Sequence, residues 1–377
     1  MKKNKKVMFV CPYFFPHTGG SEQYVYKIAR GLQEKYGWDV SVVTTNQDKK
    51  RLEKESLNGI KIYRLPVLFT FSNTPVNPFW YFQIKKIVKE EQPILINAHT
   101  PVPFIADIAA LVSHKITYVL TYHGGSMLKK NSIFNIPIFI YENVFLNYVL
   151  RKAKIIICAS DYIRNVFLKN RKDKSLTINP GVDAVRKLIK KTSETKIVLF
   201  VASLAKSQNY KGLEYLLKAF VAVRSRVKDV KLTVVGDGDA LSDYKKLAKD
   251  LKIERNVVFT GSLYGQKLNQ MFKQSNVFVL PSLNESFGKV LIEAMAHGTP
   301  VIGTNVGGIP DVVTHGKEGF LVPPGDTAQL AKSIIRILEN NSLANSLGKA
   351  GFEKVKANYL WSKQVSATNE VFEKLLS

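Results

Sequence analysis

Short apolar runs alternate with amphipathic stretches along the whole chain. The runs hold four to six residues and are rich in Val, Ile and Leu, whereas the stretches between them repeat apolar residues at helical spacing. Runs of this kind predict strands that are buried on both faces, as in a parallel sheet covered by helices. The predicted strands are Val7–Cys11, Val40–Thr44, Ile94–Asn97, Thr117–Thr121, Ile155–Ala159, Lys196–Val201, Lys231–Val235, Val257–Thr260, Val277–Leu280 and Val301–Thr304.

The strand–helix cycle begins again near Lys196, which predicts two α/β domains. We expect a first domain at residues 1–185 and a second at residues 190–358, with the hinge within 180–195, a charged stretch that has no strand pattern. A chain of 377 residues is long for one core and sufficient for two. Each domain is predicted to be a doubly wound parallel sheet that binds ligands at the carboxyl ends of its strands.

The N-terminus and the cysteines predict a cytoplasmic protein. The basic start at residues 2–6 precedes an apolar run that is short and ends at Pro12, which favours a first strand over a signal peptide. We find no run of about twenty apolar residues, the length that a membrane-spanning helix needs. Cys11 and Cys158 lie in separate apolar runs and are predicted to be buried thiols in a reducing compartment.

The chain carries a formal charge of +25, most of it in the first half. Residues 1–187 hold 29 Lys and Arg against 13 Asp and Glu, whereas residues 188–377 hold 26 against 17. An anionic membrane surface, an anionic substrate or a solvated lysine-rich surface each accounts for this excess. Nucleic acid is not an expected partner, because no helix-turn-helix, zinc-finger or RNA-binding motif is present.

The segment from Pro281 to Ala294 is the most informative part of the chain. Glu285 and Glu293 lie eight residues apart, the first in a loop and the second about two turns into a helix that Gly288 or Lys289 begins. Backbone N–H groups at the start of a helix form an anion site. A phosphate held between two carboxylates suits a nucleotide-sugar.

These residues resemble the signature of the retaining glycosyltransferases of family GT4. The pattern continues in order through Ala296–Ile302, Gly307–Asp311 and Gly319–Asp326, and matches begin at Gly19, so the resemblance covers most of the chain. It implies the GT-B fold, in which two Rossmann-like domains face a central cleft and the C-terminal helix, here 360–377, returns to the first domain. It implies no metal and no other cofactor, and leaves donor base, sugar and acceptor open.

The resemblance assigns roles to residues of the second domain. Lys211, before Gly212, matches the lysine that neutralises the leaving diphosphate. The arginine of the same family element is replaced by Ser203, and Lys206 is a candidate to supply the missing charge. Glu293 would bind the ribose hydroxyls and Glu285 those of the transferred sugar, while Phe287, Gly288 and Lys289 would offer backbone N–H groups to phosphate.

In the first domain, Gly19, Gly20 and Glu22 resemble the family's G-G-x-E loop near the diphosphate and the acceptor. His123 matches the T-x-H-G histidine near the transferred sugar, and His99 ends a neighbouring predicted strand. The expected catalytic residues are therefore His123, Lys211 and Glu285, the donor-binding residues Gly19, Gly20, Lys206, Lys211, Phe287, Gly288, Lys289 and Glu293, and the acceptor-binding residues Glu22 and His99. Asp237-Gly238-Asp239 directly follows a strand and is predicted to be a turn rather than a D-x-D metal motif.

Residues 133–150 are aromatic and apolar with basic residues at both ends. They suit either an ordinary core helix, the interpretation we favour for the helix itself, or a surface in the membrane interface that presents a lipid-linked acceptor. Two rival functions remain open: a GT-B nucleotide-sugar epimerase, which turns over without an acceptor, and a degenerate scaffold that binds donor without chemistry, for which Ser203 is the argument.

Overall fold

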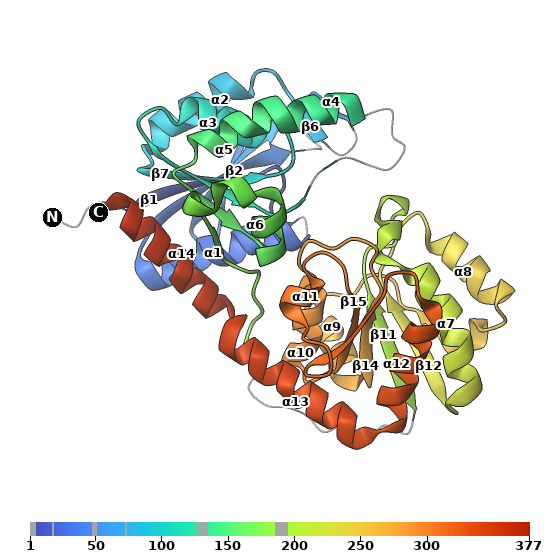
Figure 1. Ribbon diagram of the computed structural model, residues 1–377. Helices are drawn as coiled ribbons and strands as arrows, with labels where there is room; N and C mark the ends of the chain where they lie inside the picture. The colour runs from blue at the N-terminus through green and yellow to red at the C-terminus, as the bar shows by residue number, and fades with distance from the viewer. Residues whose placement is uncertain are drawn as a thin grey trace. The chain divides into compact units, whose positions relative to one another are not determined.

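The computed structural model describes residues 5–16, 19–46, 51–71, 74–125, 127, 135–184 and 195–377. The chain forms two compact units (Figure 1). Unit 1 comprises Met1–Pro180 and Trp361–Ser377, and unit 2 comprises Gly181–Leu360. Both are α/β with Rossmann-like parallel sheets, so the predicted fold class is confirmed. The expected hinge falls largely on residues 185–194, which lie outside the described part of the chain.

Unit 1 is built on an eight-stranded sheet in the order β10-β9-β8-β7-β1-β2-β4-β3. Its neighbouring strands are parallel except for β3, which pairs antiparallel with β4 at the edge. A separate hairpin pairs β5 with β6. The sequence pattern did not predict β3 to β6 or β10. Strand β3 is polar and largely exposed, and β5, β6 and β10 hold three residues each, whereas β4 was missed although most of its residues are buried. The strands are β1 (Lys6–Val10), β2 (Asp39–Asn46), β3 (Glu53–Leu57), β4 (Ile60–Pro66), β5 (Phe69–Phe71), β6 (Thr74–Val76), β7 (Leu95–Thr100), β8 (Thr117–Tyr122), β9 (Ile155–Cys158) and β10 (Ser175–Thr177).

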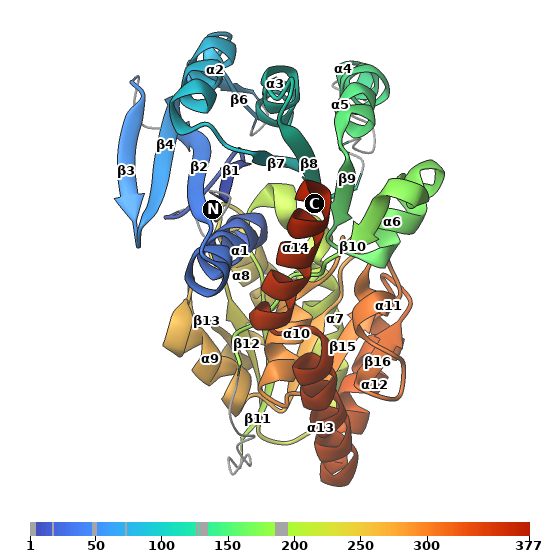
Figure 2. The same ribbon diagram turned by 90° about the vertical axis from the view of Figure 1, so that its left-hand side faces the viewer.

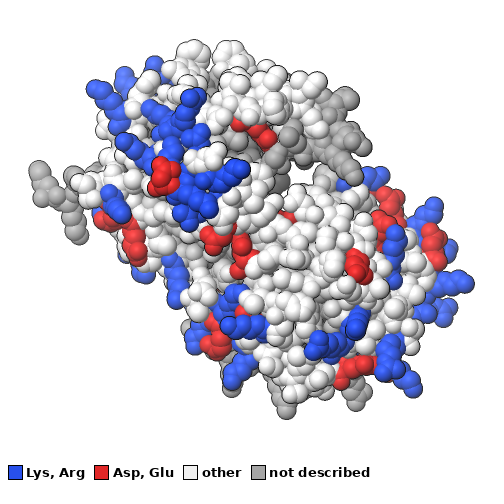
Figure 3. All heavy atoms as spheres, in the orientation of Figure 1, with Lys and Arg blue, Asp and Glu red and all other residues white. Residues whose placement is uncertain are grey.

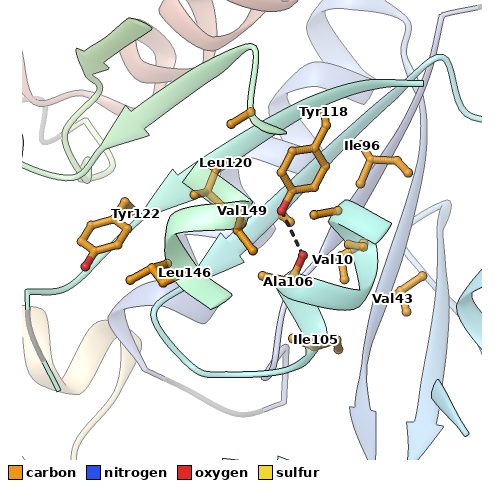
Figure 4. Close-up of a cluster of buried hydrophobic side chains, with 14 of the residues drawn as sticks. Val10, Val43, Ile96, Ile105, Ala106, Tyr118, Leu120, Tyr122, Leu146 and Val149 are labelled. Carbon is orange, nitrogen blue, oxygen red and sulfur yellow. Dashed lines mark hydrogen bonds between the residues drawn. The ribbon is translucent and has the colours of Figure 1, made fainter. Parts of the chain in front are cut away.

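Helices cover both faces of this sheet, which explains why its central strands are apolar throughout. In β1, Met8 and Val10 face one core and Val7 and Phe9 face the other, as the two-residue period of a strand requires. Figure 4 shows part of the first core, where the Tyr118 hydroxyl donates to the Ala106 carbonyl at 3.0 Å. The helices are α1 (Gly20–Tyr36), α2 (Trp80–Glu91), α3 (Ile105–Val112), α4 (Asn135–Ile140), the π-helix η1 (Tyr141–Phe145), α5 (Leu146–Lys152), α6 (Asp161–Phe167) and the 3-10 helix η2 (Lys169–Lys174).

The C-terminal helix α14 (Trp361–Leu376) packs beside α1 in unit 1 (Figure 2). A Cβ on Gly31 would lie 2.4 Å from Val365 Cγ2, so the glycine lets the two helices approach closely. The indole N–H of Trp38 donates to Asn369 at 2.8 Å, and Tyr36 donates to Ser366 at 3.1 Å. The last helix therefore completes the second core of unit 1.

Unit 2 contains a six-stranded, fully parallel sheet in the order β13-β12-β11-β14-β15-β16. Helices α7 and α12 pack on one face, and α9, α10 and α11 on the other. Its elements are β11 (Lys196–Val201), the 3-10 helix η3 (Lys206–Lys211), α7 (Leu213–Arg226), β12 (Val230–Val235), α8 (Leu241–Asp250), the 3-10 helix η4 (Glu254–Asn256), β13 (Val257–Phe259), α9 (Gly265–Gln274), β14 (Val277–Leu280), α10 (Lys289–Ala296), β15 (Val301–Thr304), α11 (Ile309–Val312), β16 (Gly319–Val322), α12 (Thr327–Glu339) and α13 (Asn341–Asn358).

The core-helix interpretation of residues 133–150 is wrong for much of the described part. None of the residues of α4 is buried, and Tyr141 is the one buried residue of the π-helix. Besides Tyr141, the segment contributes Leu146, Val149 and Leu150 to the core of unit 1. Large apolar side chains remain exposed along it, namely Ile136, Phe139, Ile140, Val144, Phe145 and Tyr148.

Both cysteines are buried free thiols, as the sequence predicted. Burial raises the pKa of Cys158 to about 12, and burial also raises the pKa of Cys11. Neither thiol therefore ionises near neutral pH. Within the described residues, no helix combines the length and the hydropathy needed to cross a membrane.

Candidate active site

Lys211 and Glu285 form an ion pair in unit 2. The Nζ of Lys211 lies 2.7 Å from Glu285 Oε2, and the side chains are 23% and 11% exposed. Lys211 ends the 3-10 helix η3, and Glu285 lies in the loop after β14, so residues 74 positions apart meet beyond the carboxyl ends of neighbouring parallel strands. This is the edge of an α/β sheet where ligands bind.

Gly212 is required for this approach. Its φ of 81° lies in the left-handed region, and a Cβ would stand 2.0 Å from the carbonyl oxygen of Pro281. The turn after Lys211 therefore packs directly on the start of the Glu285 loop. In addition, the Leu283 amide donates to the Tyr210 carbonyl at 2.7 Å, which joins the two segments on either side of the ion pair.

A glycine pair, Gly307 and Gly308, holds the Glu285 loop from the other side. Gly308 N–H donates to the Glu285 carbonyl at 2.9 Å. Gly307 has a φ of 54°, and a Cβ there would stand 1.9 Å from the same carbonyl oxygen. The resemblance includes this Gly-Gly run but assigns no role to it. The structure shows that it fixes the backbone that carries Glu285.

Opposing effects act on the charge of Lys211. Burial favours the neutral amine, but the charges of Glu285 and Tyr210 and the hydrogen bond to Glu285 outweigh it and raise the pKa of Lys211 above its usual value. The ammonium is therefore retained at neutral pH. Its Nζ also lies 5.3 Å from the centre of the Tyr210 ring, a cation–π distance.

Glu293 lies on α10, where it forms an i,i+4 ion pair with Lys289 at 2.6 Å. Its side chain is 26% exposed, so the carboxylate is paired and also partly open to solvent. Gly288 caps α10 in the left-handed conformation with no side-chain cap, and neither the Phe287 N–H nor the Gly288 N–H has a partner among the described residues. Of the three N–H groups expected to bind phosphate, those of Phe287 and Gly288 are thus available at the first turn.

Lys206 occupies a different environment from Lys211. It begins η3, is 60% exposed, and lies 3.7 Å from Asp243 of α8. Ser203, at the position of the family arginine, is exposed and accepts from the Ala205 N–H at 3.3 Å. In this structure the charge of Lys206 is directed toward Asp243, and its role as a substitute for the arginine stays a prediction.

In unit 1, the loop before α1 brings Gly19 and Glu22 together. Glu22 is 8% exposed, its carboxylate accepts from Ser21 at 3.0 Å, and a Cβ on Gly19 would stand 2.1 Å from its Oε2. Around Gly20 nothing lies within 4 Å of an added Cβ. Gly19 is therefore needed because a side chain there would collide with the Glu22 carboxylate at the start of the helix. A side chain at Gly20 would meet no other atom.

His99 and His123 form a contacting pair at the ends of β7 and β8. Their rings are stacked with centres 5.0 Å apart, and His99 Nδ1 lies 2.7 Å from His123 Nε2. His99 is 1% exposed and His123 is half-buried. Burial lowers the pKa of His123 to about 4 and, with the nearby charge of His123, holds the pKa of His99 well below its usual value. Both rings are neutral at neutral pH.

This arrangement changes the expectation for His99. A side chain that is 1% exposed lies beneath His123 and does not itself reach an acceptor. Tyr24 of α1, which the sequence did not single out, packs edge-on against His123 at 5.0 Å. Only its position in the helix after the Gly-Gly loop pointed to it.

Asp237 and Asp239 form a turn. The Asp237 carboxylate accepts from the Gly238 N–H at 2.8 Å, and Asp239 accepts from the Lys206 N–H at 2.6 Å. A Cβ on Gly238 would stand 2.3 Å from the backbone of Leu204, so the turn packs on the chain after β11. Across the described ranges, no three His, Cys, Asp or Glu side chains converge as ligands for a metal ion.

Comparison with known proteins decides the family. Residues 18–186 match the model of Glycosyltransferase Family 4, and residues 182–354 match that of Glycosyl transferases group 1. The chain belongs to the GT4 glycosyltransferases. It is 28% identical to an uncharacterized glycosyltransferase of Methanocaldococcus jannaschii, covering 100% of both chains. It is 27% identical to the N-acetyl-alpha-D-glucosaminyl L-malate synthase of Bacillus anthracis, covering 98% of this chain and 97% of the relative.

Solved structures show the GT-B fold for this GT4 enzyme. Sucrose-phosphate synthase from Thermosynechococcus elongatus superposes with a TM-score of 0.80 at 23% identity, covering 99% of each chain. HepE from Anabaena, solved in complex with UDP and glucose, superposes with a TM-score of 0.75 at 20% identity, covering 98% of this chain and 100% of that one. The protein is thus a glycosyltransferase with the GT-B fold.

Proposed function

We propose that this GT4 enzyme transfers a sugar from a nucleotide-sugar to a hydroxyl acceptor with retention of configuration. The observation that supports this most is the partly buried Lys211–Glu285 pair beside the uncapped start of α10. It places a cation, a carboxylate and backbone N–H donors together at a ligand-binding edge. HepE, a protein of the same fold, is solved with UDP-glucose, and a uridine or guanosine diphosphate sugar suits this chemistry.

In this proposal unit 2 holds the donor. The N–H groups of Phe287 and Gly288 bind diphosphate oxygens, and the Lys211 ammonium stabilises the charge that develops when the bond from sugar C1 to phosphate oxygen breaks. Glu293 accepts hydrogen bonds from the ribose hydroxyls, and Glu285 from hydroxyls of the sugar. Each glutamate pairs with a lysine in this structure. When the donor binds, a hydroxyl of the ligand replaces the lysine as one hydrogen-bond partner of each carboxylate.

Unit 1 supplies the acceptor side. Glu22 binds the acceptor, and His123 binds an oxygen of the acceptor or of the sugar. The acceptor oxygen forms its bond to C1 on the face that the leaving group vacates, and its proton passes to the departing diphosphate oxygen. No metal ion and no other cofactor takes part in this scheme, because Lys211 and the helix start carry the neutralising charge.

The acceptor that we propose is lipid-linked and reaches the enzyme at an anionic membrane surface on the cytoplasmic side. The exposed apolar side chains of α4, η1 and α5 are followed by eight basic residues within 151–174, against two aspartates. Figure 3 shows Lys and Arg side chains gathered over the part of unit 1 that holds α5 and α6. Apolar and aromatic residues next to a basic cluster suit an interface with anionic lipid.

Transfer is tested by following nucleoside diphosphate release from UDP- and GDP-sugars, with and without a lipid-phosphate acceptor. The proposal predicts release that depends on the acceptor, and a product with the anomeric configuration of the donor. Sugar interconversion without acceptor would indicate an epimerase instead. Donor binding without release under any condition would indicate a scaffold.

Membrane binding is tested by sedimentation with vesicles of neutral lipid or neutral plus anionic lipid. The proposal predicts binding to the anionic vesicles, weakened by the double change Lys169→Glu/Lys172→Glu and unchanged by Lys245→Glu/Lys246→Glu on α8 of unit 2. Equal loss in both double variants would show a nonspecific charge effect and contradict this surface.

A further inference from the structure

Two ring nitrogens of the histidine pair have opposite surroundings. Nε2 of His99 is buried and has no hydrogen-bond partner, within the part of the chain that the structure describes. Nδ1 of His123 also lacks a partner among those residues, but it is not among the buried unpaired atoms. The pair therefore has one closed end inside the unit and one open end at its surface.

The strand register creates this pair. His99 of β7 lies opposite Thr121 of β8, and His123 follows two residues later on the same face. The His123 N–H donates to the Thr100 carbonyl at 3.0 Å, which continues the ladder past the end of β8. Phe9 and Tyr24 pack on the His99 ring at 5.9 and 6.2 Å and complete its enclosure. The geometry is thus imposed by the sheet rather than by a mobile loop.

Two neutral tautomer arrangements satisfy the 2.7 Å contact. In the first, His99 donates from Nδ1 to Nε2 of His123, which leaves a bare lone pair at the buried Nε2 of His99 and a proton on Nδ1 of His123. In the second, His123 donates from Nε2, which forces a proton onto the buried Nε2 of His99. A buried N–H without an acceptor is rarer in proteins than an unpaired acceptor, so the first arrangement is favoured.

We propose that His99 is a positioning residue, which holds His123 as the Nδ1–H tautomer so that His123 presents an N–H donor, not a lone pair, to the ligand. This rests on the proposed function for its consequence, since the ligand atom would be an oxygen of the sugar or acceptor. The low pKa values of both rings agree with it, because a neutral pair keeps a single proton in the contact. His123 then orients an oxygen and does not act as a general base.

Gly124 and Gly125 follow His123 in close contact with the rest of unit 1. A Cβ on Gly124 would stand 3.1 Å from the Pro101 ring, and one on Gly125 would stand 2.6 Å from Phe167. The chain after His123 therefore packs tightly against its own unit.

The test is tautomer-sensitive ¹⁵N–¹H NMR of the full-length protein labelled at histidine, without substrate. We expect His99 and His123 both to show a proton on Nδ1. In His99→Phe, which keeps an aromatic ring but has no donor, His123 should shift toward the Nε2–H form. In His99→Asn the side-chain amide replaces the Nδ1–H donor, and the wild-type tautomer should return.

Kinetics give the second readout. His99→Phe should lower kcat/KM for transfer by about tenfold, the effect of one hydrogen bond, and His99→Asn should restore most of it. A proton on Nε2 of His123 in the wild type, or a His123 tautomer unaltered in His99→Phe, would overturn the proposal. The wild-type spectrum requires neither a folded variant nor a substrate, so it tests the tautomer even if no transfer activity is found. Absence of transfer would contradict the proposed function and not the tautomer assignment.

Discussion

The Nζ of Lys211 lies 2.7 Å from the carboxylate of Glu285, although 74 residues separate them along the chain. The turn at Gly212 and the loop held by Gly307 and Gly308 fix the two backbones, so the ion pair is set by the fold of unit 2. A cation that already has a carboxylate partner stays charged when a donor diphosphate arrives. The arrangement is therefore ready for binding before any ligand is present.

Replacing the ammonium tests this arrangement. Lys211→Met keeps the length of the side chain and removes the charge, and we expect kcat to fall by about 10²- to 10³-fold, as for other groups that stabilise transition-state charge. Lys218→Met is the matched control, because Lys218 forms an exposed i,i+4 pair with Glu214 on α7. The measurement is the steady-state kcat of sugar transfer in the wild type and in the two variants. Wild-type turnover in Lys211→Met would remove this lysine from the mechanism.

Glu293 should act on donor affinity more than on the chemical step. Glu293→Gln keeps the shape but weakens acceptance of ribose hydroxyls, and we expect the KM for the nucleotide-sugar to rise by about tenfold with a smaller change in kcat. Glu339→Gln at the end of α12, which removes an exposed pair with Arg226, is the comparison. A fall in kcat at unchanged KM would contradict the ribose assignment.

Substitutions at two glycines with positive φ distinguish the effect of a steric clash from that of backbone strain. Gly307→Ala places a Cβ against the Glu285 carbonyl, whereas Gly316→Ala, at a φ of 78°, enters open space. Both pay a conformational cost of about 1–2 kcal/mol. We expect Gly307→Ala to cost more stability in urea unfolding and also to lower activity, since it displaces Glu285. Equal effects in the two variants would contradict the role of Gly307 in holding that loop.

The contact between α1 and α14 predicts a reversed glycine effect. Gly-to-Ala in a helix interior normally stabilises by about 1 kcal/mol, but at Gly31 the new Cβ would meet Val365 at 2.4 Å. Gly31→Ala should therefore destabilise unit 1, and Val365→Ala should relieve the clash in the double variant. Thermal unfolding of the three variants measures the coupling. Additive effects without rescue would show that the helices have room to separate.

The histidine pair predicts a stability change in mild acid. Because burial lowers the pKa of His123 to about 4, the unfolded chain binds protons there more readily than the folded one. This contribution to stability is complete above about pH 6.5 and is lost as pH falls toward 4. The double variant His99→Phe/His123→Phe should show a shallower loss in urea unfolding between pH 7.5 and 5 than the wild type. His114→Gln, at an exposed histidine, should follow the wild type.

The sequence predicted the central strands well, because a strand buried on both faces is apolar at nearly every position. Val277–Leu280, Lys196–Val201 and Val301–Thr304 have the predicted bounds. It missed the edge strand β3, whose residues are partly or fully exposed and mostly polar. It also missed the short hairpin of β5 and β6, which forms through pairing between the two strands and not through an alternating apolar pattern. A local pattern carries no signal for such strands.

For the site, motifs gave the residues but not their contacts. The E-x7-E spacing predicted that Glu285 and Glu293 flank a helix start, yet not that Lys211 and Lys289 would pair with them. The His99–His123 contact depends on the register of β7 and β8, which residue types alone do not specify. The exposure of six large apolar side chains between Ile136 and Tyr148 was not predicted either, because an apolar pattern alone does not show whether a helix packs on a sheet.

The most direct test of the nucleotide-sugar site is a thermal-shift panel of UDP, GDP, ADP and their sugar conjugates. A ligand that binds only the folded protein raises its melting temperature. We expect a rise with UDP or GDP and their sugars, which is lost in both Lys211→Met and Glu293→Gln and retained in Lys218→Met. The proposed nucleotide-sugar site would be contradicted if no nucleotide raised the melting temperature. It would also be contradicted if Lys211→Met and Glu293→Gln showed the same rise as the wild type.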